Sequence, residues 1–99
     1  NVMTKDEIIS EIISYFGLSQ GTNFANYYVG ITNDVERRLF HEHNVLKNGA
    51  WIYCPADDKS VAQDVEKFFL NLGMAGDTGG GMTDTTVVYC YLITSYTKE

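Results

Sequence analysis

The basic side chains that could handle a phosphate or a proton are concentrated in one short stretch. Arg37 and Arg38 are the only arginines of the chain, and its only histidines, His41 and His43, follow within five residues of Arg38. An arginine can direct two parallel donors at a phosphate or a carboxylate. Histidine changes its charge near neutral pH and can carry a proton during a reaction. This stretch is therefore the strongest functional signal in the sequence.

Helical spacing distributes these side chains around the helix expected there. At about 100° per residue, Arg37 falls opposite the apolar stripe, Arg38 lies on one flank, and His43 lies on the other. Arg38 can then lean over the edge of a sheet and bind an anion. The alternative is a surface arginine that pairs with a nearby acid, Glu36 or Glu42.

A carboxylate is expected at the edge of the apolar face of a later helix. Glu66 lies four residues after Ala62 and three before Phe69, in a segment with apolar residues at helical spacing. It could hold Mg²⁺, which takes one or two carboxylates and keeps most of its waters. The alternative is a glutamate that only solvates the helix surface.

Tyrosines of two predicted strands supply further candidate hydroxyl groups. Successive strand residues face opposite sides of a sheet, so Tyr27 and Tyr28 point apart. By the same rule, Tyr89 and Tyr91 share one face. A hydroxyl at the end of a strand could take part in chemistry, whereas a buried tyrosine often only finds a hydrogen-bond partner.

A resemblance to the GIY-YIG nucleases lies in the segment Tyr28-Val29-Gly30-Ile31-Thr32-Asn33-Asp34-Val35-Glu36-Arg37-Arg38-Leu39. In that family a Tyr-Ile-Gly strand is followed by a helical arginine. Tyr28-Val29-Gly30 matches the strand element, and Arg38 stands at the place of the arginine. The segment Ala62-Gln63-Asp64-Val65-Glu66-Lys67-Phe68-Phe69-Leu70 is similar to the family's later helix, in which Glu66 matches a metal-binding glutamate.

The resemblance implies a small α/β domain that cleaves nucleic-acid phosphodiester bonds, with DNA as a substrate. In that family tyrosine hydroxyls help to activate water, the arginine steadies the phosphate, and the glutamate holds one divalent ion. Carried over, these roles fall to Tyr28, Arg38 and Glu66, with Mg²⁺ or Mn²⁺ as the cofactor. His41 or His43 is then the candidate proton carrier.

The first half of the family's motif, a Gly-Ile-Tyr strand ahead of the YIG strand, is absent. The upstream segment from Ser19 to Asn26 is expected to be a loop. The strand that carries Tyr89 and Tyr91 could occupy the missing position, and the domain would then be a permuted version in which one of them supplies the lost hydroxyl. Glu42 stands at the usual place of the family's helical histidine.

Periodicity and capping residues predict the elements that position these side chains. Thr4 and Glu7 form a capping box ahead of an isoleucine stripe, and Gly17 is a natural stop. Ser60 is the expected cap of the helix that carries Glu66. The expected elements are a helix over Lys5–Phe16, a strand over Tyr27–Thr32, a helix with Val35, Leu39 and Leu46 on its apolar stripe, a strand over Ala50–Cys54, a helix with Val61, Val65, Phe68, Phe69 and Leu72 on its apolar face, a loop over Met74–Asp84, a strand over Val87–Thr94 and a fraying tail from Ser95.

The alternation of helix and strand predicts one α/β (α+β) domain over residues 1–99. Its sheet is expected to have about three strands, mainly antiparallel and flanked by about three helices.

The net charge of −6 weighs against tight binding of nucleic acid, because phosphate affinity comes mainly from lysine and arginine. A nuclease of this charge would rely on a protein partner or another domain to bring DNA. The second hypothesis is a catalytically inactive form of the fold that serves as a binding or inhibitory module, for example of a phage or mobile element. A third is a small-ligand binder that uses Arg38 and the glycines at 79–81 for an anionic group.

No apolar run approaches the length of a membrane span, and the beginning of the sequence lacks the order of a secretory signal. The chain is therefore expected to be soluble and cytoplasmic, without a membrane partner. Cys54 and Cys90 lie in apolar, strand-like runs, which favours buried reduced thiols over a disulfide or a metal pair.

Overall fold

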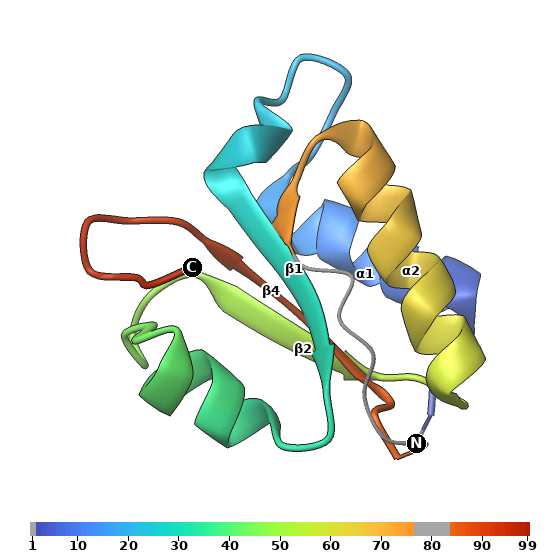
Figure 1. The fold of residues 1–99 in the computed structure, drawn as a ribbon. Coiled ribbons are helices and arrows are strands. Elements are labelled where there is room, and N and C mark those ends of the chain that lie inside the picture. The colour runs from blue at the N-terminus through green and yellow to red at the C-terminus, as the bar shows by residue number, and fades with distance from the viewer. Residues whose placement is uncertain (1, 77–83) are drawn as a thin grey trace.

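A four-stranded mixed sheet forms the centre of the fold (Figure 1). The structure is a computed structural model and describes residues 2–76 and 84–99. Across the sheet, the strand order is β2 (Trp51–Pro55), β4 (Val87–Leu92), β1 (Tyr27–Thr32) and β3 (Ala75–Gly76). β4 is antiparallel to both of its neighbours, and β3 is parallel to β1. The predicted α/β (α+β) class is confirmed.

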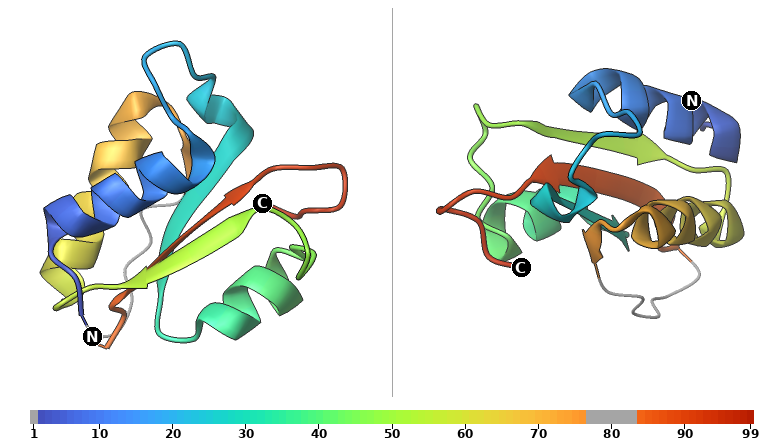
Figure 2. Two further views of the ribbon diagram at one scale, coloured as in Figure 1. Left: turned by 180° about the vertical axis from the view of Figure 1, so that it is seen from behind. Right: turned by 90° about the horizontal axis from the view of Figure 1, so that it is seen from above.

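Helices lie on both faces of this sheet. α1 (Lys5–Phe16) crosses one face and η2 (Arg37–Glu42) lies over the opposite face, as the view from above in Figure 2 shows. α2 (Lys59–Leu72) packs against α1, β1 and β4. A short 3-10 helix, η1 (Phe24–Asn26), leads into β1. Among the described residues, none of the helices has the length and apolar character needed to span a bilayer.

The first helix begins and ends where its sequence predicts. The Thr4 hydroxyl accepts the Glu7 N–H at 3.2 Å, and the Glu7 carboxylate accepts the Thr4 N–H at 2.9 Å. Gly17 ends the helix in the left-handed conformation with a φ of 64°, which costs a glycine little. Ile8 and Ile12 on the inner face are fully buried, so the capping box and the isoleucine stripe together specify α1.

Strand alternation divides the core into two clusters on opposite faces of the sheet. One cluster lies against α1 and α2 and takes from the strands Val29, Val88 and Cys90. The other lies on the face covered by η2 and takes from the strands Tyr28, Tyr89 and Tyr91. Tyr27 packs at the margin of the first cluster. The predicted opposite orientations of Tyr27 and Tyr28, and the shared face of Tyr89 and Tyr91, are therefore confirmed.

Both cysteines are buried free thiols, as predicted. Burial raises the pKa of Cys54 to about 11 and raises that of Cys90 as well. Because the thiolate is the reactive form of cysteine, neither side chain is a nucleophile at neutral pH.

Two boundary predictions around α2 are wrong. Asp58, not Ser60, caps the helix, because the Asp58 carboxylate accepts the Val61 N–H at 2.9 Å. The segment predicted as a loop over Met74–Asp84 contains a fourth strand, Ala75–Gly76, which pairs with β1. A pair of small residues has no alternating apolar pattern by which a strand could be recognised. Residues 77–83, including the three glycines of the suggested anion loop, lie outside the described residues.

The segment that follows β4 does not fray as predicted. β4 ends at Leu92, and the chain then folds back toward the end of η2. The Lys98 N–H donates to the His43 carbonyl at 2.7 Å, and Asn44 Nδ2 donates to the Tyr96 carbonyl at 2.8 Å. Residues 94–99 are therefore held against the helix that carries the basic side chains.

Gly30→Ala tests the close approach of Tyr89 to β1. A Cβ atom at position 30 would lie 2.5 Å from both the Cζ and the hydroxyl oxygen of Tyr89, so the ring or the strand would have to shift. We expect the free energy of unfolding, measured by urea denaturation, to fall by about 1–3 kcal/mol. At Gly21 a Cβ atom would meet nothing within 4 Å, and the control Gly21→Ala should change stability by less than about 0.5 kcal/mol. An unchanged urea midpoint in Gly30→Ala would contradict this packing.

Candidate active site

The helix after β1 has a geometry that brings Arg38 and His43 together. Residues Arg37–Glu42 form a π-helix, in which the His43 N–H donates to the Arg38 carbonyl at 2.9 Å. A hydrogen bond between residues five apart encloses one residue more than the α-helical bond, so these two side chains reach the same side of the helix. The prediction of opposite flanks is wrong for this reason. Leu46, expected on the apolar stripe, lies beyond the helix and is 47% exposed.

The hydroxyl group of Tyr89 is the point at which η2 meets the sheet. Arg38 Nη2 donates to the Tyr89 hydroxyl oxygen at 3.2 Å, and His43 Nε2 lies 2.9 Å from the same oxygen. Tyr89 pairs with Gly30 in the register of β4 and β1, and its ring lies over the bare backbone of that glycine. Three predicted site residues from two separate elements therefore share one hydrogen-bonded cluster.

The partners of His43 indicate which of its ring nitrogens carries the proton. His43 Nδ1 lies 2.7 Å from the Lys98 carbonyl oxygen, which can only accept a hydrogen bond, so Nδ1 is the donor. Burial lowers the pKa of His43, and the positive charge of Arg38 acts in the same direction. A neutral imidazole with a proton on Nδ1 has a bare Nε2, and Tyr89 is then the donor to that nitrogen. Burial raises the pKa of Tyr89, which keeps its hydroxyl protonated.

Tyr91 lies on the opposite side of the imidazole from Tyr89. Its hydroxyl donates to Glu99 Oε2 at 3.1 Å and lies 3.0 Å from His43 Nδ1, whose proton it can accept. Burial raises the pKa of Tyr91 as well, so its hydroxyl remains protonated. Sequence reasoning missed Lys98 and Glu99, because no spacing or composition signal marks the segment after β4 as part of a site.

The ring of Tyr28 packs beside the hydrogen-bonded groups. It stacks on Tyr91 with ring centroids 5.2 Å apart and on Tyr89 with centroids 6.2 Å apart. The His43 ring lies 4.6 Å from the Tyr28 ring between centroids. Tyr28 is 5% exposed, so it joins the cluster as a buried aromatic side chain.

Glu66 approaches the cluster from α2. Its side chain is 3% exposed and lies on the buried face of the helix with Val65 and Phe69. The largest cause of the raised pKa of Tyr89 is burial, and the negative charge of Glu66 adds to it. The alternative of a glutamate that only solvates the helix surface is therefore wrong.

Glu42 bridges the two arginines on the outer side of η2. Its carboxylate forms an ion pair with Arg37 Nε at 3.0 Å and a second with Arg38 Nη1. The hydrogen bond from Arg38 lowers the pKa of Glu42, which therefore stays ionised at neutral pH. The predicted pairing of Arg38 with a nearby acid is confirmed, because its Nη1 pairs with Glu42, while its Nη2 reaches the Tyr89 hydroxyl.

His41 lies outside this cluster. It is exposed and borders a shallow hollow with Asp34, Glu36 and Arg37. Of the two histidines considered as proton carriers, His43 is the one that contacts Tyr89.

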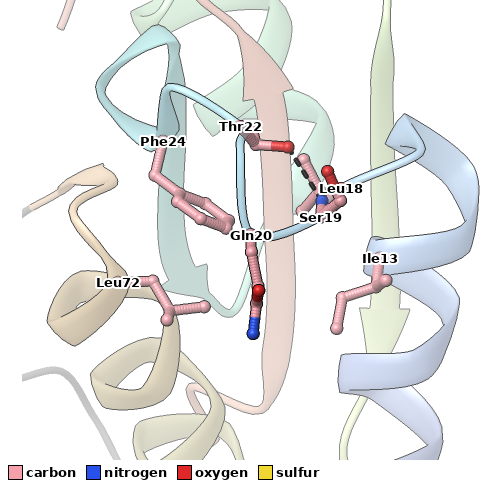
Figure 3. A pocket seen from close by; sticks show the side chains of 7 residues that line it. All are labelled: Ile13, Leu18, Ser19, Gln20, Thr22, Phe24 and Leu72. Carbon is pink, nitrogen blue, oxygen red and sulfur yellow. Dashed lines mark hydrogen bonds between the residues drawn. The ribbon is translucent and has the colours of Figure 1, made fainter.

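A separate hollow of about 500 Å³ lies near the ends of α1 and α2 (Figure 3). Its wall is mainly apolar and includes Ile13, Phe24 and Leu72, with the polar side chains of Gln20 and Thr22 at its margin. Among the residues that the structure describes, no charged side chain lines it. The candidate groups for handling a phosphate, Arg38 and His43, lie outside this hollow.

Comparison with known proteins adds no family to this geometry. No protein-family model, curated protein or solved structure matches the chain. The chemistry of the cluster is therefore argued from the side chains themselves.

The lowered pKa of His43 makes stability depend on pH. Its folded-state pKa lies below the ordinary 6.5, so the unfolded chain binds the extra proton more readily. The resulting stability is present above the unfolded pKa and is lost as the pH falls from there toward the folded pKa. We expect the urea concentration at the unfolding midpoint to decrease as the pH is lowered from about 7 to about 5. His43→Gln should reduce that fall and His41→Gln should not, and equal slopes in both variants would contradict the assignment.

Proposed function

We propose that this chain is a metal-dependent phosphodiester hydrolase of the GIY-YIG type, with β4 in the place of the missing first strand. The observation that carries the proposal is the Tyr89 hydroxyl, which lies within hydrogen-bond distance of both Arg38 and His43. β4 pairs directly with β1, the strand that bears Tyr28-Val29-Gly30. A permuted domain of this family requires a tyrosine hydroxyl and the helical arginine to meet beside that strand.

Each group in the cluster suits one part of such a reaction. The Arg38 side chain is about one-third exposed and could neutralise charge that develops on the phosphate oxygens. Tyr89 donates to a neutral imidazole and could take a proton from an attacking water as its own proton passes to His43. Tyr28 shapes the aromatic wall beside these groups. DNA is the proposed substrate, and the acidic balance of the chain favours delivery of DNA by a partner protein.

Glu66 is the residue that would hold Mg²⁺ or Mn²⁺. Among residues 2–76 and 84–99, no three His, Cys, Asp or Glu side chains form a ready-made metal-binding group. Magnesium does not need such a group, because it binds through one or two carboxylates and keeps several waters. In this proposal the carboxylate of Glu66 would be the protein ligand of the ion. When bound, the ion would supply positive charge to the phosphate.

Nicking of supercoiled plasmid DNA in the presence of Mg²⁺ or Mn²⁺ tests this proposal. Arg38→Ala and Tyr89→Phe each remove one stabilising group and should lower the rate by about 10²–10³-fold. Glu66→Gln should remove the increase in nicking rate that Mg²⁺ or Mn²⁺ produces. Arg37→Ala, a change to the exposed neighbour outside the cluster, should retain most of the rate. Equal nicking by all samples would indicate a contaminating nuclease and would overturn the catalytic assignment.

A second candidate is a non-catalytic binding or inhibitory module, and two observations favour it. Tyr89 has no exposed surface, so a water attacking a bound phosphate would need the cluster to open before it reached this hydroxyl. Glu42 also offsets the charge of both arginines, which weakens their electrostatic attraction for an anion. In such a module the buried network would serve to hold η2 on the sheet.

Glu42→Gln tests whether the ion pairs limit anion binding. Neutralising this carboxylate should strengthen binding of a labelled single-stranded oligonucleotide by roughly three- to tenfold at low salt, measured by fluorescence anisotropy. Glu36→Gln makes the same change in net charge at an exposed position of the preceding turn and is the matched control. Equal affinities for the two variants would contradict a specific role of Glu42. Tighter binding without nicking by any sample would favour the second candidate.

A further inference from the structure

The segment after β4 contacts His43 at its backbone and at its ring. The Lys98 N–H donates to the backbone carbonyl of His43 at 2.7 Å, and the Lys98 carbonyl lies 2.7 Å from His43 Nδ1. One residue on, the Glu99 carboxylate accepts the Tyr91 hydroxyl, which itself lies 3.0 Å from Nδ1. His43 is 4% exposed. A stretch of chain distant in sequence is therefore in contact with both the backbone and the ring of one buried histidine.

We propose that the segment after β4 is a positioning device, which holds His43 in the Nδ1–H form so that Nε2 is the proton acceptor for Tyr89. The opposite tautomer would direct the lone pair of Nδ1 at the oxygen of the Lys98 carbonyl at 2.7 Å, where two acceptors repel each other. It would also place a hydrogen on Nε2 and remove the acceptor from the Tyr89 hydroxyl. The Lys98 carbonyl therefore sets the direction of two hydrogen bonds, its own with Nδ1 and that between Nε2 and the Tyr89 hydroxyl.

Each element that packs against His43 places charged or titratable groups near it. Arg38 and Glu42 act on it from η2, Glu99 acts from the segment after β4, and Tyr28, Tyr89 and Tyr91 pack against its ring from the sheet. Burial lowers its pKa and outweighs the opposing carbonyl and carboxylates. The Nδ1–H form is accordingly a neutral imidazole, and its Nε2 retains a lone pair near neutral pH.

The catalytic consequence rests on the proposed function. As water attacks phosphorus, a new P–O bond forms and the bond to the leaving oxygen breaks. The proton of the water passes to the Tyr89 oxygen while the Tyr89 proton passes to His43 Nε2, which leaves tyrosine unchanged and makes an imidazolium. The leaving oxygen takes a proton from solvent, and His43 later returns its proton to solvent. No oxidant or further reactant is needed.

The protonation state of each ring nitrogen can be read directly by nuclear magnetic resonance. In ¹⁵N-labelled protein at about pH 7.5, above the ordinary histidine pKa, two-bond ¹H–¹⁵N spectra should show His43 with a protonated Nδ1 and a bare Nε2. His41, which is exposed, is the internal reference, and His41→Gln assigns the signals. A protonated Nε2 in the unmodified chain would overturn the proposal, whether or not the protein cleaves DNA.

Variants at residue 98 separate the carbonyl from the side chain. Lys98→Ala keeps both backbone groups and should leave the tautomer unchanged. Lys98→Pro removes the N–H that binds the His43 carbonyl, and a stop after Thr97 removes the Lys98 carbonyl, so both should give a mixture of tautomers. An unchanged Nδ1–H form in a folded stop variant would overturn the proposal, and the amide spectrum reports folding. If that variant does not fold, the tautomers of the unmodified chain and of Lys98→Pro decide.

Nicking assays on the same proteins distinguish this proposal from the proposed function. If the chain is a nuclease, the stop variant should lose rate and shift its pH profile, whereas Lys98→Ala should match the unmodified chain. If no sample nicks DNA but the tautomers change as expected, the positioning role stands and the nuclease proposal falls. Changed tautomers with an unchanged pH profile would remove His43 from the reaction.

Discussion

The missing side chain at Gly30 is the constraint on which the rest of the cluster depends. The Tyr89 ring lies over β1 at this residue, and any Cβ atom there would overlap its hydroxyl end. Without that space the hydroxyl could not reach both Arg38 and His43. A glycine that reads as a weak point in a strand is therefore the reason that a residue of β4 and a helix following β1 share one polar centre.

The second requirement is the π-helical geometry of η2. A regular α-helix would separate Arg38 and His43 around its circumference, whereas the longer hydrogen-bonded loop brings them to one side. The segment after β4 then covers His43 and satisfies its Nδ1. Each polar contact described around the imidazole joins a hydrogen-bond donor to an acceptor. Buried polar groups are stable only when they are paired in this way.

Charge balance separates the two functional candidates. In the proposed nuclease Arg38 would bind the phosphate, but one carboxylate, Glu42, already pairs with Arg38 and with its neighbour Arg37. The chain as a whole is acidic, and the Tyr89 hydroxyl is buried. Catalysis would require substrate to compete with Glu42 and the cluster to open, whereas a module that only binds an anion would not require the cluster to open. The free energies of these two steps determine which function the same arrangement can perform.

The sequence by itself determined the elements whose signals are local. The Thr4 capping box, the isoleucine stripe of α1 and the alternating strands predicted the fold class and the shared face of Tyr89 and Tyr91, because each depends on residues close in the chain. Ala75–Gly76 and the docking of Lys98 on His43 were not predictable, because they depend on pairing between distant segments. Only the tertiary structure decided that Arg38, His43 and Tyr89 meet, since this required an irregular helix, a bare glycine and a returning chain to coincide in space.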